Sequence, residues 1–455
     1  MPDSFDVIVI GGGPGGYHAA IRAAQLGKNT AVVEMDKPGG RCLNYACIPA
    51  KTMLHTAEIF DHARNGAELG ITVKDASLDW QTLGERRTKV SEQLSGGVKM
   101  LWDKNKVTVI QGKGSLDKDA NVVVDGTTYE AGAVVLATGS VALPIPGVEF
   151  GDRIVDTWGA WSLPALPKSI AVVGAGASGA EIASAYVRYG TDVTLIEMLP
   201  QILPAEDKDV VRVVERVFKK QGIKILTGTP ISDVEVGKSS VKAKVGDEAI
   251  EVEYLAIAGG RGPDTEGLGV DAAGVKLDDR GRIEIDEYQR TSNPKVYAIG
   301  DLVRGPALAH KAQEEGVIAA EVIAGAPTHP LDPELVPGAT FCHPQVASVG
   351  MTEQQAKDAG KDIKTSRMKL GAVGAGTVYD DRDGFVKLVV DSEYGEIIGA
   401  HIVGNRACDM ISEIVDTIAL EGGYQELARI IHPHPTISEA VLESARAVDG
   451  WAIHQ

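Results

Sequence analysis

Two cysteines near the start of the chain are the side chains with the clearest capacity for chemistry. Cys42 and Cys47 are five positions apart, and the chain has only two further cysteines, Cys342 and Cys408. Four cysteines in 455 residues are too few for a disulfide scaffold. A zinc site needs two more thiolates or histidines at suitable spacing, and we find no such group. The pair is therefore either a redox couple or two unrelated buried thiols.

A disulfide between these two cysteines requires an irregular backbone. Five residues of a straight α-helix rise about 7.5 Å, whereas the Cα atoms of a disulfide lie within about 7 Å of each other. Pro49 lies two residues after Cys47 and is well placed to limit regular helix there. We therefore expect a distorted turn between Cys42 and Cys47.

Two glycine-rich segments follow one pattern at a constant offset of 174 − 11 = 163 residues. Each follows an apolar stretch, precedes a segment of helical character and has a glutamate 23 positions after its first glycine. The corresponding residues are Gly11 and Gly174, Gly13 and Gly176, Gly16 and Gly179, Gly27 and Gly190, and Glu34 and Glu197. A phosphate-free glycine turn does not require this context. The pattern therefore predicts two βαβ units that each bind a dinucleotide.

The chemistry of the fingerprint explains why these residue types are needed. The first glycine allows a tight turn, the second lets the backbone approach the pyrophosphate, and the third lets the helix pack closely on the strand. The helix N-terminus presents unpaired N–H groups and the positive end of its dipole to the phosphates. The glutamate at the end of the second strand accepts hydrogen bonds from ribose hydroxyls.

We expect an α/β fold with two Rossmann-like dinucleotide-binding domains and a C-terminal α+β domain. Within the last segment, residues 385–390 alternate as in a strand, and residues 411–430 fit one face of a helix. The expected divisions are the first part of one dinucleotide-binding domain at 1–145, the second such domain at 146–265, a return to the first domain at 266–335, and the C-terminal domain at 336–455.

Charge and hydropathy argue against two classes of partner. The chain has 45 basic and 63 acidic residues, and a uniformly acidic surface repels nucleic acid and anionic lipid. No apolar run reaches the ~18 residues of a membrane span. The N-terminal Met1–Asp6 is acidic and lacks the basic start of a secretory signal. We therefore expect a cytoplasmic protein without nucleic-acid or membrane partners.

Several segments resemble one known family. Gly39–Lys51, with the sequence GGRCLNYACIPAK, resembles the active-disulfide segment of the flavin disulfide reductases. Residues 297–316, YAIGDLVRGPALAHKAQEEG, are similar to the flavin segment of the dihydrolipoamide dehydrogenases within that family. The C-terminal HPHPTISE at 432–439 resembles the family's base motif, and residues 341–350 are also similar. The resemblance covers nearly the whole chain.

The resemblance implies FAD on the first unit and NAD on the second. The residues it places around FAD, besides Gly11, Gly13 and Gly16, are Glu34, Lys51, Gly114, Gly139, Asp301 and Ala309. Those around NAD are Gly174, Gly176, Gly179, Glu197 and Gly260. Because a carboxylate repels a 2′-phosphate, Glu197 favours NAD over NADP. Glu181 is implied to pair with Lys51, although by itself it is an ordinary first-turn acid stabilised by the helix dipole.

The resemblance also implies the reaction, the oxidation of dihydrolipoamide to lipoamide with hydride transfer to NAD. Cys42 would exchange with the substrate dithiol and Cys47 would face the flavin. His434 would act as base and Glu439 would orient it, although Thr436–Glu439 also has the pattern of a capping box. The C-terminal domain would form a homodimer, and the partner would be the lipoyl-bearing domain of a 2-oxoacid dehydrogenase or glycine-cleavage complex.

Four alternatives remain, three within the enzyme class and one outside it. Glutathione-type and mercuric reductases use NADPH, which Glu197 disfavours, and the tail Val448–Gln455 lacks the cysteine pair of a mercuric reductase. A flavin transhydrogenase lacks the full cysteine pair. A catalytically silent flavoprotein that serves as a binding or sensing subunit does not need intact Cys42 and Cys47. Departures from the family pattern that bear on substrate preference and rate are Arg41, Ala46, Ala50, Ala177, Ser178 and Pro433.

Overall fold

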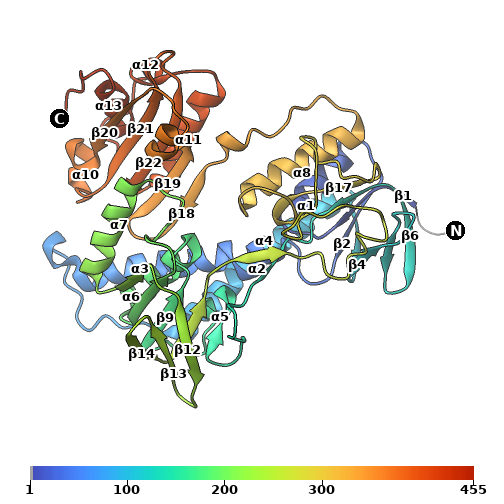
Figure 1. The fold of residues 1–455 in the computed structure, drawn as a ribbon, viewed down its shortest axis with the longest axis horizontal. Helices are drawn as coiled ribbons and strands as arrows, with labels where there is room; N and C mark the ends of the chain where they lie inside the picture. The colour runs from blue at the N-terminus through green and yellow to red at the C-terminus, as the bar shows by residue number, and fades with distance from the viewer. Residues whose placement is uncertain (1–3, 455) are drawn as a thin grey trace. The chain divides into compact units, whose positions relative to one another are not determined.

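The structure, a computed structural model, describes residues 4–454, so that Met1–Asp3 of the acidic N-terminus and Gln455 of the tail lie outside the described residues. Its contacts divide the chain into two units (Figure 1). The first unit contains residues 4–52, 81–143 and 260–333, and the second contains residues 53–80, 144–259 and 334–454. The four-part division expected from the sequence stays a prediction.

The first unit is built on a sheet whose centre is parallel. Strand β1 (Ser4–Ile10) lies between β2 (Thr30–Glu34) and β6 (Thr127–Leu136), and α1 (Pro14–Gln25) connects β1 to β2. Residues 7–10 are all buried, as expected for a parallel strand that is covered on both faces. The sheet order is β3-β2-β1-β6-β5-β4, with β17 paired to β6, and the remaining strands are β3 (Thr108–Gln111), β4 (Gly114–Leu116), β5 (Val122–Val124) and β17 (Val296–Ala298).

Helix α8 (Ala309–Ala324) packs backbone to backbone on α1. A Cβ atom placed on Gly316 would lie 2.4 Å from the Gly15 carbonyl oxygen, and one on Gly15 would lie 2.8 Å from the Ala312 carbonyl oxygen. Two glycines therefore allow this close approach. The other helices with residues in this unit are α2 (Gly40–Tyr45), the start of α3 (Cys47–Asn65), nearly all of α4 (Trp80–Lys104) and the short 3₁₀ helix η2 (Gly300–Leu302); β7 (Ser140–Ala142) pairs with β16 (Arg261–Pro263).

The second unit repeats the βαβ arrangement. Strand β9 (Ser169–Val173), helix α6 (Ala177–Tyr189) and strand β10 (Asp192–Glu197) form the second copy. The sheet is parallel throughout, in the order β11-β10-β9-β15-β8. The other strands of this sheet are β8 (Ile154–Val155), β11 (Lys224–Thr227) and β15 (Tyr254–Ile257). A separate sheet contains β12 (Ile231–Val236), β13 (Val241–Val245) and β14 (Glu248–Val252), and the helices of this region include α5 (Thr157–Trp161) and α7 (Lys208–Gln221).

The C-terminal part of the second unit is an antiparallel sheet covered by helices. Its order is β18-β19-β22-β21-β20, and Ile411 and Ile414 of α11 lie in the same apolar cluster as Val386 and Leu388 of β21. The elements are β18 (Gly338–Thr340), β19 (Gln345–Gly350), α9 (Glu353–Asp358), β20 (Ile363–Lys369), α10 (Gly374–Val378), β21 (Phe385–Asp391), β22 (Ile397–Gly404), α11 (Ala407–Ala419), α12 (Tyr424–Leu427) and α13 (Glu439–Ala447). The predicted fold class, two Rossmann-like units and an α+β domain, is confirmed.

The helix predicted over 411–430 has the wrong ends. Helix α11 begins at Ala407 and ends at Ala419, because Glu421 adopts a φ of +58° and the N–H of Gly422 donates to the Thr417 carbonyl oxygen at 2.9 Å. This left-handed turn ends the helix in the manner of a C-cap. The apolar residues on which the prediction rested, from Ile411 to Ala419, all lie in α11, and residues 424–427 form the separate helix α12.

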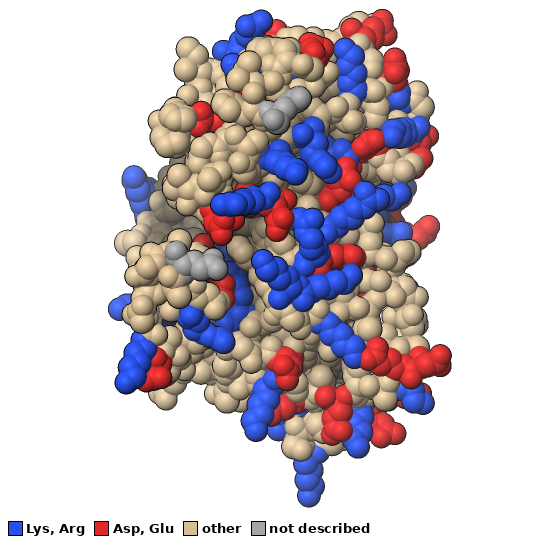
Figure 2. Space-filling model, turned by 90° about the vertical axis from the view of Figure 1, so that its left-hand side faces the viewer, with Lys and Arg blue, Asp and Glu red and all other residues tan. Residues whose placement is uncertain are grey.

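The net charge predicted a uniformly acidic surface, but the surface of the structure carries both charges. On the face shown in Figure 2, Lys and Arg side chains gather over the middle of the view, and Asp and Glu side chains lie between them. Exposed ion pairs mix the two charges, as in Arg216 with Asp383 at 3.0 Å. The net charge therefore does not describe every part of the surface. None of the described helices has both the length and the apolar character to cross a bilayer.

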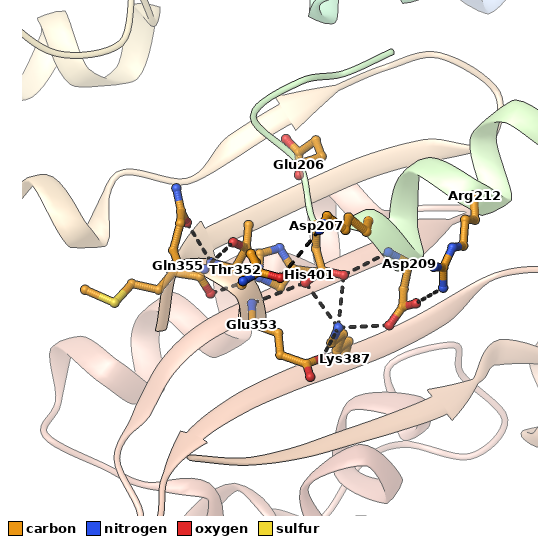
Figure 3. A network of polar contacts seen from close by, with 12 residues as sticks. Glu206, Asp207, Asp209, Arg212, Thr352, Glu353, Gln355, Lys387 and His401 are labelled. Atoms are coloured by element: carbon orange, nitrogen blue, oxygen red, sulfur yellow. Dashed lines mark hydrogen bonds and ion pairs between the residues drawn. The ribbon is translucent and has the colours of Figure 1, made fainter. Parts of the chain in front are cut away.

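A buried lysine joins the C-terminal sheet to the second βαβ region. Strand β21 was predicted from its alternation, and Val386 and Leu388 do face the apolar core, but Lys387 on the other face is also buried. Its ammonium lies 3.0 Å from Asp207 Oδ1, 2.9 Å from Asp209 Oδ2 and 2.7 Å from Glu353 Oε2 (Figure 3). These carboxylates come from the N-terminal ends of α7 and α9.

Contact with Lys387 helps to lower the pKa values of two carboxyl groups in this cluster. Burial raises the pKa of Asp207, but hydrogen bonds from the Asp209 N–H and from Lys387 outweigh it, and the pKa lies below its usual value. Hydrogen bonds from Lys357 and Lys387 likewise lower the pKa of Glu353. A lowered carboxyl pKa stabilises the fold above the usual pKa, and that contribution is lost as the pH falls through the lowered value. We therefore expect acid to loosen this contact.

Replacement of Lys387 by Met should destabilise the protein strongly. Removing one partner of a buried ion cluster leaves uncompensated carboxylates and costs about 3–5 kcal/mol. The matched control is Lys357→Met, which removes an exposed partner of the same Glu353 and should cost about 0.5 kcal/mol or less. Urea unfolding followed by circular dichroism measures both, and equal effects of the two substitutions would contradict this account.

Candidate active site

The backbone between the two cysteines is broken as the geometry required. Helix α2 ends at Tyr45, Ala46 has φ −135° and ψ −94°, and α3 begins at Cys47. Pro49 lies in the first turn of α3, where no N–H is needed for the helix ladder. The proline therefore prevents α2 from running on into α3 without disturbing α3 itself.

The two thiols are in contact. Cys42 and Cys47 are half-buried, and a hydrogen bond joins their side chains. This hydrogen bond, followed by burial, raises the pKa of Cys42, and the Lys51 ammonium acts in the opposite direction. Two sulfur atoms held this close by a kinked backbone can form and break a bond to each other, which is the chemistry of a redox couple.

The segment that carries the two cysteines, Gly39–Lys51, is called the redox segment below. It packs directly on the first glycine-rich loop. The Gly39 N–H donates to the Gly12 carbonyl oxygen at 2.9 Å, and a Cβ on Gly40 would lie 2.7 Å from the Gly13 Cα atom. Both Gly39 and Gly40 have positive φ values, of +86° and +55°. The side-chain amide of Asn44 donates to the Gly40 carbonyl oxygen at 2.9 Å and fixes the turn.

The geometry of the two glycine-rich loops fits a bound pyrophosphate. A Cβ on Gly16 would lie 1.8 Å from the Gly11 carbonyl oxygen, and one on Gly179 would lie 1.8 Å from the Gly174 carbonyl oxygen. These glycines allow the helix to meet the strand. In contrast, a Cβ on Gly13 or on Gly176 would meet no atom of the chain within 4 Å. The open space beside the second glycine is where the fingerprint places phosphate oxygens.

Each loop is tied to the glutamate that follows it. Glu34 accepts from the Gly12 N–H at 2.8 Å, and Glu197 accepts from the Ala175 N–H at 2.8 Å. Both carboxylates are largely buried and retain further acceptor positions for a ribose. One difference between the copies is Gly12, which corresponds to Ala175 in the second loop, since a Cβ on Gly12 would lie 2.8 Å from the Trp102 ring.

The remaining residues expected near FAD lie in the first unit. Gly114 begins β4, where a Cβ would lie 3.0 Å from the Ile10 side chain, whereas one on Gly139 would be unobstructed. Asp301 lies in η2 and accepts a hydrogen bond from the Ser140 hydroxyl. Ala309 is the first residue of α8. Each is therefore compatible with the predicted role, which stays a prediction.

Two more predicted residues are Glu181, expected to pair with Lys51 beside the flavin, and Gly260, expected near NAD. Glu181 lies in α6 of the second unit, is 5% exposed and accepts from the Phe341 N–H at 2.9 Å. Gly260 is assigned to the first unit and has a φ of +155°. The pairing of Glu181 with Lys51 stays a prediction. The interpretation of Glu181 as a first-turn acid is wrong, because it is the fifth residue of α6, and its contact with Phe341 was not predicted.

The C-terminal histidine and glutamate form a pair. His434 Nδ1 lies 2.9 Å from Glu439 Oε1, and the His434 side chain is 75% exposed. Burial raises the pKa of Glu439, but hydrogen bonds from His434 and from the Thr436 N–H outweigh it, and the pKa lies below its usual value. With Nδ1 directed at a carboxylate, Nε2 is the atom that can accept a proton.

The predicted capping box at Thr436–Glu439 is only half formed. The Glu439 carboxylate accepts from the Thr436 N–H at 2.9 Å, but the Thr436 hydroxyl donates to the Pro433 carbonyl oxygen. Helix α13 begins only at Glu439, so Thr436 cannot be its N-cap residue. The local pattern was therefore wrong about the helix start, while the contact between His434 and Glu439 is present.

Two polar residues, Tyr45 within the redox segment and Asp36 just before it, were not predicted. The Tyr45 hydroxyl donates to Asp36, whose own N–H donates to Glu34 Oε1 at 2.8 Å. Burial, then the hydrogen bond to Asp36, raises the pKa of Tyr45 to about 12. These contacts connect α2 to the glutamate of the first βαβ unit. The only sequence signal was the position of Tyr45 between the two cysteines.

Within residues 4–454, no group of three or more His, Cys, Asp or Glu side chains is arranged to hold a metal ion. The polar groups described above are instead suited to organic cofactors and to thiol chemistry. Two dinucleotide cradles, one of them in contact with the segment that carries a cysteine pair, define a redox enzyme that passes electrons between a disulfide and nucleotide cofactors.

Comparison with known proteins agrees with this class. The family model described as pyridine nucleotide-disulphide oxidoreductase matches residues 5–316, and the dimerisation domain of the same family matches residues 336–445. The chain belongs to this family. It is an NAD-dependent flavoprotein oxidoreductase whose cofactors are FAD and NAD.

Individual relatives match over their full length. Proteins named dihydrolipoyl dehydrogenase from Rhizobium etli and Cupriavidus necator are 40% and 41% identical to the chain, with 98% and 99% of each chain covered. Among solved structures, LpdA from Mycobacterium tuberculosis is similar with a TM-score of 0.91 and 27% identity, covering 98% of this chain and 99% of that chain. The flavoprotein disulfide reductase RclA from Escherichia coli is similar with a TM-score of 0.88 and 25% identity, covering 97% and 100%.

Replacing the second glycine of each loop by alanine should affect the binding of one cofactor at a time. Gly13 and Gly176 have φ values of −69° and −70°, which alanine adopts without strain, and their Cβ positions are open. Gly13→Ala should weaken FAD binding about tenfold or more, since a methyl group occupies phosphate space, and Gly176→Ala should act on NADH alone. Flavin and NADH fluorescence titrations measure both. Equal loss of both nucleotides in either variant would contradict the assignment.

Proposed function

We propose that this chain oxidises dihydrolipoyl groups to lipoyl groups with NAD as acceptor, through Cys42, Cys47, His434 and Glu439. The observation that carries the proposal is the cysteine pair in thiol contact, held against the first dinucleotide cradle. The relatives at about 40% identity named dihydrolipoyl dehydrogenase support the choice of substrate. With FAD bound, the flavin supplies the relay of two electrons between the thiols and NAD.

The chain's own residues carry out the exchange of sulfur bonds. A substrate thiolate attacks Cys42 of the oxidised pair, so that the Cys42–Cys47 bond breaks and a mixed disulfide forms. The second substrate sulfur displaces Cys42, which leaves the substrate as a disulfide and both cysteines reduced. Lys51 supports a negative charge on this pair. The substrate loses two electrons and two protons in total.

His434 accepts the proton of the attacking thiol at Nε2. Its Nδ1 is held by Glu439, which fixes the tautomer and stabilises the charged imidazole. Because the imidazole is largely exposed in the single chain, it is available to a second molecule.

We assign the active form to a homodimer whose sites combine Cys42 and Cys47 of one chain with His434 of the other. The match of residues 336–445 to a dimerisation domain supports this assignment. Exposed apolar residues close to the histidine support it as well, since Ile431 is 95% exposed and Ile430 is 44% exposed. An isologous interface delivers one histidine to each of two sites.

The proposed setting is cytoplasmic, and the proposed partner is the lipoyl-bearing domain of a 2-oxoacid dehydrogenase or glycine-cleavage complex. A lipoyl group on a protein arm can enter a site that two chains share. Glutathione-type and mercuric reductases use NADPH. Glu197 disfavours that coenzyme, because its carboxylate accepts from the Ala175 N–H where a 2′-phosphate would need a cation.

The purified flavoprotein should reduce NAD with dihydrolipoamide and should be far less active with NADP. Cys42→Ser and Cys47→Ser should each lower the rate by about 10³-fold or more, since neither can form the disulfide. Cys408→Ser is the matched control and should retain the rate. The rise in absorbance of NADH, or of NADPH when NADP is the acceptor, measures each of these reactions. Equal activity with glutathione disulfide and NADPH would overturn the proposed substrate.

Mixed dimers test whether the sites are shared. Inactive Cys47→Ser and inactive His434→Gln chains, dissociated and reassociated together, should regain activity, because one site of each hybrid has neither lesion. As the control, wild type mixed with a chain carrying both lesions should form hybrids without a working site. If each His434 serves its own chain, the two mixtures will give the reverse result.

A further inference from the structure

Helix α8 carries a buried ion pair beneath the turn that precedes Asp301. Lys311 and Glu315 have side chains only 4% and 3% exposed, and Lys311 Nζ lies 2.7 Å from Glu315 Oε1. Burial raises the pKa of Glu315, and the Lys311 charge offsets part of this effect. Neither residue belongs to the cofactor-lining set or to the redox machinery described above.

Both ends of this ion pair hold the backbone of a single glycine. The Gly300 N–H donates to Glu315 Oε2 at 2.7 Å, and Lys311 Nζ donates to the Gly300 carbonyl oxygen at 3.3 Å. Gly300 has a φ of +72°, a conformation that favours glycine. Two charged groups therefore fix the two peptide units on either side of one residue.

The loop that follows is wrapped over the lysine stem. A Cβ on Gly305 would lie 2.6 Å from Lys311 Cε, so the chain passes directly over this side chain. The loop leaves η2 after Leu302, one residue past Asp301, and enters α8 at Ala309. The turn at Gly300, before the loop, is therefore bound to the first two turns of α8, which follows the loop. The distance between Asp301 and Ala309 thus depends on the ion pair.

Stability alone does not explain a buried ion pair. Desolvation of two charges offsets much of their attraction, and apolar replacements of similar volume are often neutral or stabilising. The ion pair instead fixes the orientation of one residue, because both charged side chains hydrogen-bond to the backbone of Gly300. This is the arrangement by which groups outside a binding site orient those inside it.

We propose that Lys311 and Glu315 are positioning residues for FAD, which hold the Gly300 turn so that Asp301 and the N-terminus of α8 meet the cofactor together. The inference rests on the proposed FAD contacts of Asp301 and Ala309. It assigns to two further residues a role in cofactor affinity without direct contact.

The test compares substitutions of two glutamates on the same helix. Glu315→Gln keeps an acceptor for the Gly300 N–H but directs an amide toward the lysine ammonium. Glu321→Gln is the matched control, because Glu321 also pairs with a base, Arg22 at 2.6 Å, but does not contact the Gly300 turn. FAD is removed from each purified protein, and its dissociation constant is measured by flavin fluorescence as FAD is added back.

Glu315→Gln should raise the FAD dissociation constant about tenfold or more, with altered visible circular dichroism of the flavin, and Glu321→Gln should stay within about twofold of wild type. Urea unfolding of each FAD-free protein gives the stability separately. Reduced stability with unchanged FAD affinity would overturn the inference.

A second variant covers the case in which Glu315→Gln does not fold. Lys311→Met with Glu315→Gln leaves no isolated buried charge and should also bind FAD about tenfold or more weakly; affinity like that of wild type would overturn the inference. If the wild-type chain itself binds no FAD, the proposed function fails instead. The two failures are therefore distinguishable.

Discussion

The contact between the redox segment and the first glycine-rich loop is the constraint on which the candidate site depends. Gly40 lies against Gly13, and a single Cβ atom on Gly40 would overlap the Gly13 Cα atom. The loop can approach because the third glycine, Gly16, lets α1 meet β1. Through this backbone contact, the position of the cysteine pair and the position of the cofactor cradle are set by one piece of structure. Asp36 and Tyr45 connect the same two segments through their side chains.

The features that could be predicted from the sequence are those with a local physical cause. The two loops were predictable because the helix–strand approach excludes a side chain at Gly16 and Gly179. The break at Ala46 was predictable because two sulfur atoms cannot meet across a straight helix. The full fold class followed from the repeat, together with the family resemblance that extends over nearly the whole chain.

The features that could not be predicted depend on partners far away in the chain. The pattern of β21 indicated a strand, but the burial of Lys387 depends on Asp207, which lies 180 residues earlier. The end of α11 at Ala419 is set by a left-handed residue that apolar periodicity does not report. The half-formed capping box shows the same limit, since the Thr436 hydroxyl is engaged by Pro433 instead of by the helix. Tertiary contacts outweigh local preference in each case.

The two glycine-rich loops have the same backbone pattern but are packed differently at Gly12 and at the corresponding Ala175. In the first copy, the indole of Trp102 fills the space that a methyl group would need beside Gly12. In the second copy, Ala175 places such a methyl group in a fully buried position. The two loops share a pattern but are no longer exchangeable parts. A graft of the second loop into the first copy would force the indole outward, and the reverse graft would leave a methyl-sized void. The repeat is therefore retained in the backbone and lost in the packing around it.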